Sequence, residues 1–137
     1  RSIIIKNRTF SRSCSLANEF SRFGKVTAVE DSDSSLDLFT SNINLILNCS
    51  SVGMKNGPAE RSSPLKADQI PSSSIVCDMV YNPSITPLMK EANLSGATVL
   101  GGLPMLIFQG AASFELWLNH PAPLQVMFRA AEEALGY

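Results

Sequence analysis

Apolar residues in this chain fall into short runs that alternate with stretches of helical spacing. Short aliphatic and β-branched runs bounded by polar residues are typical of buried strands. We expect such strands at residues 2–6, 26–29, 45–47, 75–80 and 97–100. Apolar residues at spacings of three and four predict helices. We expect helices between Thr9 and Gly24, at 86–93, at 105–118 and at 124–135.

Signals at the ends of these segments support the assignment. Thr9 is placed to cap the first helix, whose apolar positions are Leu16, Phe20 and Phe23. Pro87 suits the first turn of its helix. The connections are expected to be an acidic, serine-rich loop at 30–35, a helical turn at 36–40, and a long segment at 53–74 with one turn near 66–70.

Short strands that alternate with helices predict an α/β domain with a doubly wound, mostly parallel sheet. Ligands bind such sheets beyond the carboxyl ends of the strands. Polar residues or glycines follow four of the predicted strands, so we expect them to form one continuous cleft edge. These residues are Asn7-Arg8-Thr9, Asn48 to Ser51, Tyr81 and Gly101-Gly102.

Composition narrows the function classes. The 137 residues suit one domain with its own core. A net charge of −1 gives no general basis for nucleic-acid binding, and no apolar run is long enough to span a membrane. Charged residues make up 17% of the chain, below the usual quarter, so we expect another domain or subunit to cover part of the surface.

The cysteine and histidine content argues against a metal centre. Cys14, Cys49 and Cys77 lie far apart, no CxxC pair occurs, and His120 is the single histidine. We expect reduced, buried thiols in a cytoplasmic protein. The first residues show no signal peptide and already have the pattern of a strand, which suggests a truncated or partial chain.

Residues 7–12 are candidates for binding a phosphate. In a dinucleotide-binding fold the end of the second strand meets the adenosine ribose, where arginine accommodates the extra phosphate of NADP. Arg8, Thr9 and Arg12 would bring two guanidinium groups and a hydroxyl to one helix N-terminus. The alternative is a helix cap flanked by two solvated arginines.

Three further motifs follow the later strands. Residues 48–54 read Asn-Cys-Ser-Ser-Val-Gly-Met and can order a polar loop, or only satisfy their own backbone. Residues 78–83 read Asp-Met-Val-Tyr-Asn-Pro, and Asp78 would need buried partners there. Residues 101–109 contain Gly-Gly-Leu-Pro-Met-Leu and end in Gln109, whose amide we expect to lie among apolar neighbours.

In order and spacing, the four motifs resemble the cofactor-binding domain of shikimate dehydrogenases. The family patterns are Asn-Arg-Thr-x-x-Arg/Lys, Asn-Ala-Thr/Ser-x-x-Gly-Met, Asp-x-x-Tyr-x-Pro and Gly-Gly-Leu-Gly-Met-Leu-x-x-Gln. This chain departs from the last at Pro104, where the family often has glycine. The resemblance runs from about Ile3 to the end of the chain, which would make residues 1–137 a partial, Rossmann-like NADP-binding domain ending in the helices 105–118 and 124–135.

The resemblance implies an oxidoreductase that uses NADP to convert shikimate reversibly to 3-dehydroshikimate, in aromatic amino-acid biosynthesis. It assigns the substrate to Tyr81 and Gln109. It assigns NADP to Asn7, Arg8, Thr9, Arg12, Asn48, Ser50, Met79, Gly102 and Met105. The proton-handling lysine and aspartate of the family lie in an N-terminal substrate domain, so no catalytic residue and no metal ligand is expected in this chain.

The family's glycine-rich loop, with the first strand and helix of the domain, would precede Ser2. We therefore expect the isolated chain to be inactive and its sheet to have two unpaired strand edges. Two alternatives stay open: a quinate or other polyol-acid dehydrogenase of the same superfamily, and a non-catalytic dinucleotide-binding module. The sequence also leaves open a homodimer.

Overall fold

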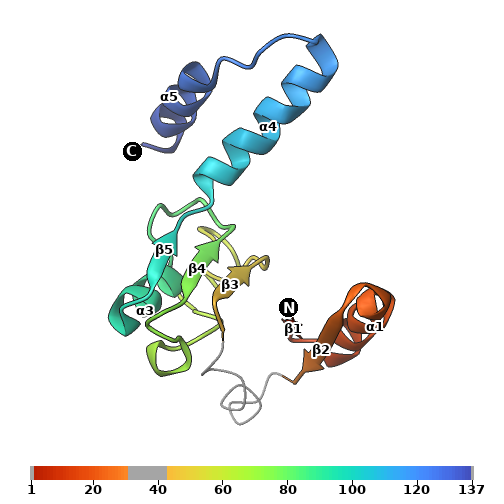
Figure 1. Ribbon diagram of the computed structural model, residues 1–137. Coiled ribbons are helices and arrows are strands. Elements are labelled where there is room, and N and C mark those ends of the chain that lie inside the picture. The colour runs from red at the N-terminus through yellow and green to blue at the C-terminus, as the bar shows by residue number, and fades with distance from the viewer. Residues whose placement is uncertain (1, 31–42, 137) are drawn as a thin grey trace. The chain divides into compact units, whose positions relative to one another are not determined.

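The computed structural model describes residues 2–30 and 43–136, in two units that comprise residues 1–42 and 43–137. The expected turn at 36–40 and most of the expected loop at 30–35 lie outside the described residues. Elements alternate between strand and helix along both units (Figure 1), which confirms the α/β class.

The first unit is a β-α-β arrangement. Strand β1 (Ser2–Lys6) pairs in parallel with β2 (Lys25–Val29), from Ser2 opposite Lys25 to Lys6 opposite Val29. Helix α1 (Phe10–Phe20) and a 3-10 turn, η1 (Ser21–Phe23), connect the two strands. The bounds of β1 are those that its β-branched run predicts.

Helix α1 packs through small residues. Ser13 and Ala17 are its buried positions, whereas Leu16, Phe20 and Phe23 are 42%, 43% and 71% exposed. The apolar residues whose spacing predicts the helix are therefore not the ones that it buries. Small side chains allow the helix to approach the strands closely, so the large apolar side chains lie outside that contact.

The second unit contains a three-stranded parallel sheet in the order β3-β4-β5. Its strands are β3 (Leu45–Asn48), β4 (Ile75–Asp78) and β5 (Thr98–Leu100). A 3-10 turn, η3 (Ala67–Gln69), lies in the long connection, and α3 (Pro87–Ser95) crosses between β4 and β5. Strand β4 is two residues shorter than its apolar run predicts, because its pairing with β3 ends at Asp78.

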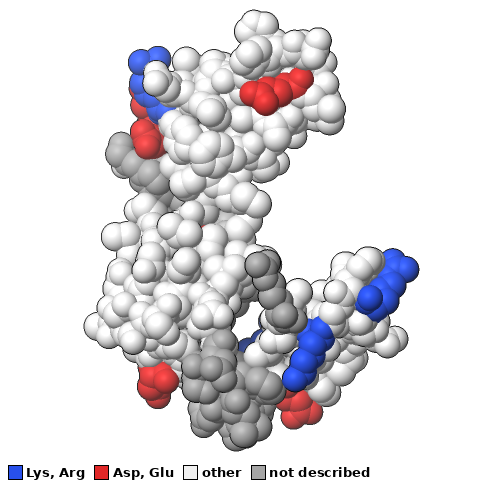
Figure 2. Space-filling view, in the orientation of Figure 1, with Lys and Arg blue, Asp and Glu red and all other residues white. Residues whose placement is uncertain are grey.

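One face of this sheet carries the core of the second unit. Val76 of β4 packs with Leu88 and Ala92 of α3, and with Ile70 and Ala97 of the flanking loops. The apolar residues of the other face are largely exposed, as for Leu45 at 60%, Leu47 at 52% and Leu100 at 50%. On the side of this unit shown in Figure 2, charged side chains lie mainly at its edges.

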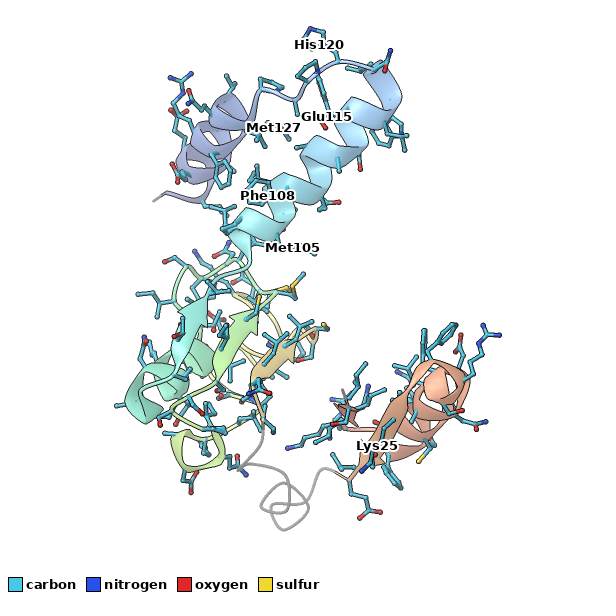
Figure 3. The ribbon with its side chains drawn as sticks, viewed as in Figure 1. Lys25, Met105, Phe108, Glu115, His120 and Met127 are labelled. Carbon is cyan, nitrogen blue, oxygen red and sulfur yellow. The ribbon has the colours of Figure 1, made fainter. Side chains whose placement is uncertain are left out.

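Helices α4 (Leu103–Leu118) and α5 (Leu124–Leu135) extend from the end of β5 and pack against each other (Figure 1). Phe108 and Phe128 meet edge-on with ring centroids 5.7 Å apart. Met127 lies between the two helices (Figure 3) and approaches Gly110. Trp117, near the end of α4, is 78% exposed. No helix among the described residues is long and apolar enough to cross a membrane.

Candidate functional site

The ends of β3 and β4 are joined by a buried polar pair. Asn48 and Asp78 are register partners in the parallel sheet. The Asn48 side-chain Nδ2 donates to Asp78 Oδ1 at 2.9 Å, and Asp78 has no exposed surface. As predicted for a buried carboxylate, Asp78 has hydrogen-bond partners: Asn48, the Val80 amide and the Thr86 hydroxyl.

Asn48 also organises the loop that follows β3. Its Oδ1 accepts hydrogen bonds from both the backbone N (3.0 Å) and the Oγ (2.7 Å) of Ser50. Ser50 Oγ in turn accepts from the Val52 amide at 3.2 Å. Gly53 is buried with a φ of +86°, a left-handed conformation in which glycine carries no steric cost. The polar side chains therefore hold the loop in a defined shape.

The loop after β4 is tied to the same loop. The Met79 amide donates to the Asn48 carbonyl at 3.0 Å, and the Lys55 amide donates to the Asn82 carbonyl at 2.8 Å. Asn82 and Pro83 are joined by a cis peptide bond. These contacts place residues 49–55 and 79–82 beside each other.

Between these two loops lies an open groove of about 420 Å³. Tyr81, 39% exposed, and Met79 contribute from the loop after β4. The groove is lined by Cys49, Ser50, Ser51, Met54, Lys55, Met79, Val80, Tyr81 and Asn82. Residues after β3 and β4 thus share one groove, as predicted, whereas Gly101 and Gly102 after β5 are not among the residues that line it.

The start of α4 adjoins the end of β4. Gly102 is buried against the backbone of Met79 and Asp78, so there is no room for a side chain there. Met105, in the first turn of the helix, is 50% exposed. Its place at the base of α4 is shown in Figure 3.

Gln109 departs from the sequence expectation. Its side chain is exposed, and its Nε2 donates to the Leu106 carbonyl of its own helix at 3.0 Å. The expectation that its amide lies buried among apolar neighbours is therefore wrong. A role for Gln109 toward a substrate stays a prediction that rests on the family pattern.

The first unit presents its candidate residues at the N-terminus of α1. Asn7 Oδ1 accepts from the Thr9 amide at 2.9 Å, and the Arg12 amide donates to the Thr9 carbonyl at 3.0 Å. Thr9 occupies the N-cap position, but its hydroxyl makes no capping bond, contrary to expectation. Arg8 and Arg12 are exposed and form no ion pair with any described residue.

The cysteines differ from the expectation of buried thiols. Cys14 and Cys49 are exposed, and Cys77 is half-buried. Burial raises the pKa of the Cys77 thiol, and Asp78 and Cys49 nearby raise it further. Cys49 lines the groove as one of the predicted cleft-edge residues Asn48 to Ser51, whereas Lys55 lines it without having been singled out from the sequence. The signal that would have found Lys55 is its position in the same loop after a strand end.

Comparison with known proteins agrees with this arrangement. Residues 102–132, which comprise most of α4 and α5, match the sequence family described as Shikimate 5'-dehydrogenase C-terminal domain. A shikimate dehydrogenase (NADP(+)) of Methanopyrus kandleri is 40% identical over 136 residues, which are 97% of this chain and 46% of that protein. By sequence and fold, the chain belongs to the shikimate dehydrogenase family.

Solved structures of the shikimate dehydrogenase family superpose on nearly the whole chain. The Listeria monocytogenes enzyme, in complex with shikimate and NAD, has a TM-score of 0.85 and 28% identity over 96% of this chain and 47% of its own. The Thermus thermophilus enzyme, in complex with NADP(H) and shikimate, has a TM-score of 0.80 and 34% identity over 98% of this chain and 46% of its own. The chain spans about half the length of these relatives.

Proposed function

We propose that the chain is the cofactor-binding part of an NADP-dependent shikimate dehydrogenase, which oxidises shikimate reversibly to 3-dehydroshikimate. The observation that carries the proposal is the groove of about 420 Å³, formed by the two loops whose motifs match the family. The names of the relatives support both the cofactor and the substrate. We further propose a cytoplasmic setting, where free thiols such as the exposed Cys14 and Cys49 stay reduced.

The N-terminus of α1 fits the phosphate that distinguishes NADP from NAD. No side chain caps this end of the helix, and its first turn contains no acidic residue. Apart from the Arg12 amide, which donates to the Thr9 carbonyl, the amides of this first turn and the guanidinium groups of Arg8 and Arg12 are therefore available to an anion. Asn7 and Thr9 shape the turn that carries Arg8.

The groove fits the redox end of the cofactor. When bound, NADP+ supplies the acceptor for the hydride that leaves shikimate. We assign Ser50, Met79 and Met105 to the surface facing this end of the cofactor. Asn48 contributes indirectly, since its side-chain atoms are engaged with Ser50, Val52 and Asp78.

Three further assignments complete the site. Gly102 contributes to the cofactor surface by letting α4 start directly against the end of β4. Tyr81, at the groove's edge, and Gln109 are assigned to the substrate. The groups that take the hydroxyl proton of shikimate would belong to a substrate domain, which the family resemblance places outside this chain.

Oxidation of shikimate by the intact protein with NADP+ tests the proposal. We expect NADPH to form from NADP+ only when shikimate is present, and NADH to form more slowly when NAD+ replaces NADP+. Faster turnover of quinate than of shikimate would contradict the substrate assignment. Tight NADP+ binding without oxidation of either acid would favour a non-catalytic binding module.

A further inference from the structure

One carboxylate receives hydrogen bonds from three segments around the groove. Asp78 is fully buried, and Asn48 Nδ2 and the Val80 amide donate to its Oδ1 at 2.9 and 3.1 Å. The Thr86 hydroxyl donates to its Oδ2 at 2.6 Å. The donors come from the end of β3, from the loop after β4 and from the residue that precedes α3.

Two of these donors lead directly to the wall of the groove. Asn48 holds Ser50, which lines the groove, through two hydrogen bonds to its Oδ1. Val80 lines the groove itself. A displacement of the Asp78 carboxylate would therefore disturb both loops at once.

The third donor links the same carboxylate to α3. Thr86 is fully buried and is the N-cap of α3, where its Oγ1 accepts from the Met89 amide at 3.2 Å. The loop after β3 also lies against the start of α3. A Cβ on Gly53 would be 3.1 Å from the Pro87 Cδ and 3.7 Å from the Thr86 Cβ.

We propose that Asp78 is a positioning residue for the groove. Its carboxylate sets the relative placement of residues 49–55 and 79–82, so the affinity of the groove for its ligand depends on it. The inference rests on the proposed function for the identity of that ligand, an NADP-type dinucleotide. A buried polar network of this kind is stable only when each member is satisfied, so the loss of one donor should loosen both loops together.

Substitution of Thr86 tests this coupling without removing the carboxylate. Thr86→Val keeps the shape of the side chain but deletes the hydroxyl that donates to Asp78, whereas Thr86→Ser retains it. Val76→Ala serves as the stability control, because Val76 is fully buried two residues before Asp78 but does not line the groove. All variants are made in the intact protein and compared below their melting temperatures.

Two readouts separate positioning from a general loss of stability. In Thr86→Val we expect the Kd for NADP+ to rise roughly tenfold, and amide exchange at Ser50 and Val52 to quicken. Thr86→Ser should restore both properties. Val76→Ala, with a melting temperature lowered to a similar degree, should keep a near-normal Kd and near-normal exchange at these amides.

Either of two results would overturn the proposal. One is that Thr86→Val and Val76→Ala weaken NADP+ binding equally at equal loss of melting temperature. The other is unchanged exchange at Ser50 and Val52 in Thr86→Val. If the unsubstituted protein binds no NADP+, the proposed function is contradicted independently of the role of Asp78. The amide-exchange data then still decide whether Asp78 couples the two loops.

Discussion

Gly102, at the start of α4, lies directly against the backbone of Met79, at the end of β4. A Cβ at position 102 would be 2.6 Å from the Met79 carbonyl carbon and 2.9 Å from the Asp78 carbonyl oxygen. Neither neighbour is a flexible side chain, so neither can yield without moving the strand end. The helix that carries Met105 and Gln109 is thereby held close to the groove.

Gly102→Ala should therefore be strongly destabilising. We expect a loss of about 2–3 kcal/mol in the free energy of unfolding, since either α4 or the end of β4 must shift. Gly101→Ala is the matched control, because the nearest atom to its Cβ would be the Met89 Cε at 3.7 Å, an ordinary contact. Urea unfolding measures the free energy of unfolding of both variants. Equal losses in the two variants would show that the close approach of Gly102 to the end of β4 does not cause the destabilisation.

Gly53→Ala should cost more than an alanine at another left-handed glycine. Gly53 and Gly96 have similar φ angles, +86° and +83°. The new Cβ would meet Pro87 at 3.1 Å in the first case and Ser72 at an ordinary 3.6 Å in the second. We expect about 1 kcal/mol for Gly96→Ala and at least about 2 kcal/mol for Gly53→Ala, by thermal or urea unfolding. If Gly53→Ala lost less stability than Gly96→Ala, the loop after β3 would lie farther from the start of α3 than the structure indicates.

Arg8→Ala should change cofactor selectivity. If its guanidinium binds the extra phosphate of NADP, its removal should weaken NADP+ binding by roughly tenfold and leave NAD+ binding nearly unchanged. Arg22→Ala is the control in the same unit, where the guanidinium lies over the Phe23 ring at 4.6 Å. Titration of each variant with both dinucleotides gives the ratio of affinities, and an unaltered ratio in Arg8→Ala would remove the phosphate assignment.

Cys77 should be the least reactive of the three thiols. Burial, followed by the charges of Asp78 and Cys49, raises its pKa and so lowers its thiolate fraction near neutral pH. We expect alkylation by iodoacetamide to be roughly tenfold slower at Cys77 than at the exposed Cys14, as followed by peptide mass mapping. Equal rates at the two sites would contradict this environment.

The raised pKa of Cys77 also predicts how the stability of the fold changes with pH. The folded thiol of Cys77 has a higher pKa than the unfolded one, so the folded state binds more protons between the two values. Its contribution to stability is present below the unfolded thiol's pKa and is lost as the pH rises through the folded value. Replacement by serine should reduce the fall in melting temperature over that alkaline range.

Local patterns in the sequence predicted most of the elements. The bounds of β1 and α5 agree with their apolar runs, and Pro87 occupies the first turn of α3 as predicted, although that helix continues to Ser95, beyond its predicted end at 93. These features depend on neighbours within a few residues. The face on which a helix packs depends on distant residues instead, which is why the apolar spacing of α1 did not reveal that Ser13 and Ala17 are its buried positions.

The candidate site was predictable in place but not in detail. Because the carboxyl ends of parallel strands share one edge, the residues after β3 and β4 were expected together, and the groove contains them. The partners of Asp78 were not predictable, since Asn48 lies thirty residues away and meets it only through strand pairing. The exposure of Gln109 was missed because its helix is apolar around most of its circumference.

The bond between Asn48 and Asp78 also bears on how the chain reaches its fold. Leu45, Ile46 and Leu47 are all apolar, so the alternation that normally selects a strand register is missing from β3. A shift by one residue would turn Asn48 away and deprive the buried Asp78 carboxylate of a donor, a costly defect. The polar pair thus discriminates against misaligned pairing of β3 with β4, and the residue that shapes the groove also specifies the correct alignment of the strands beneath it.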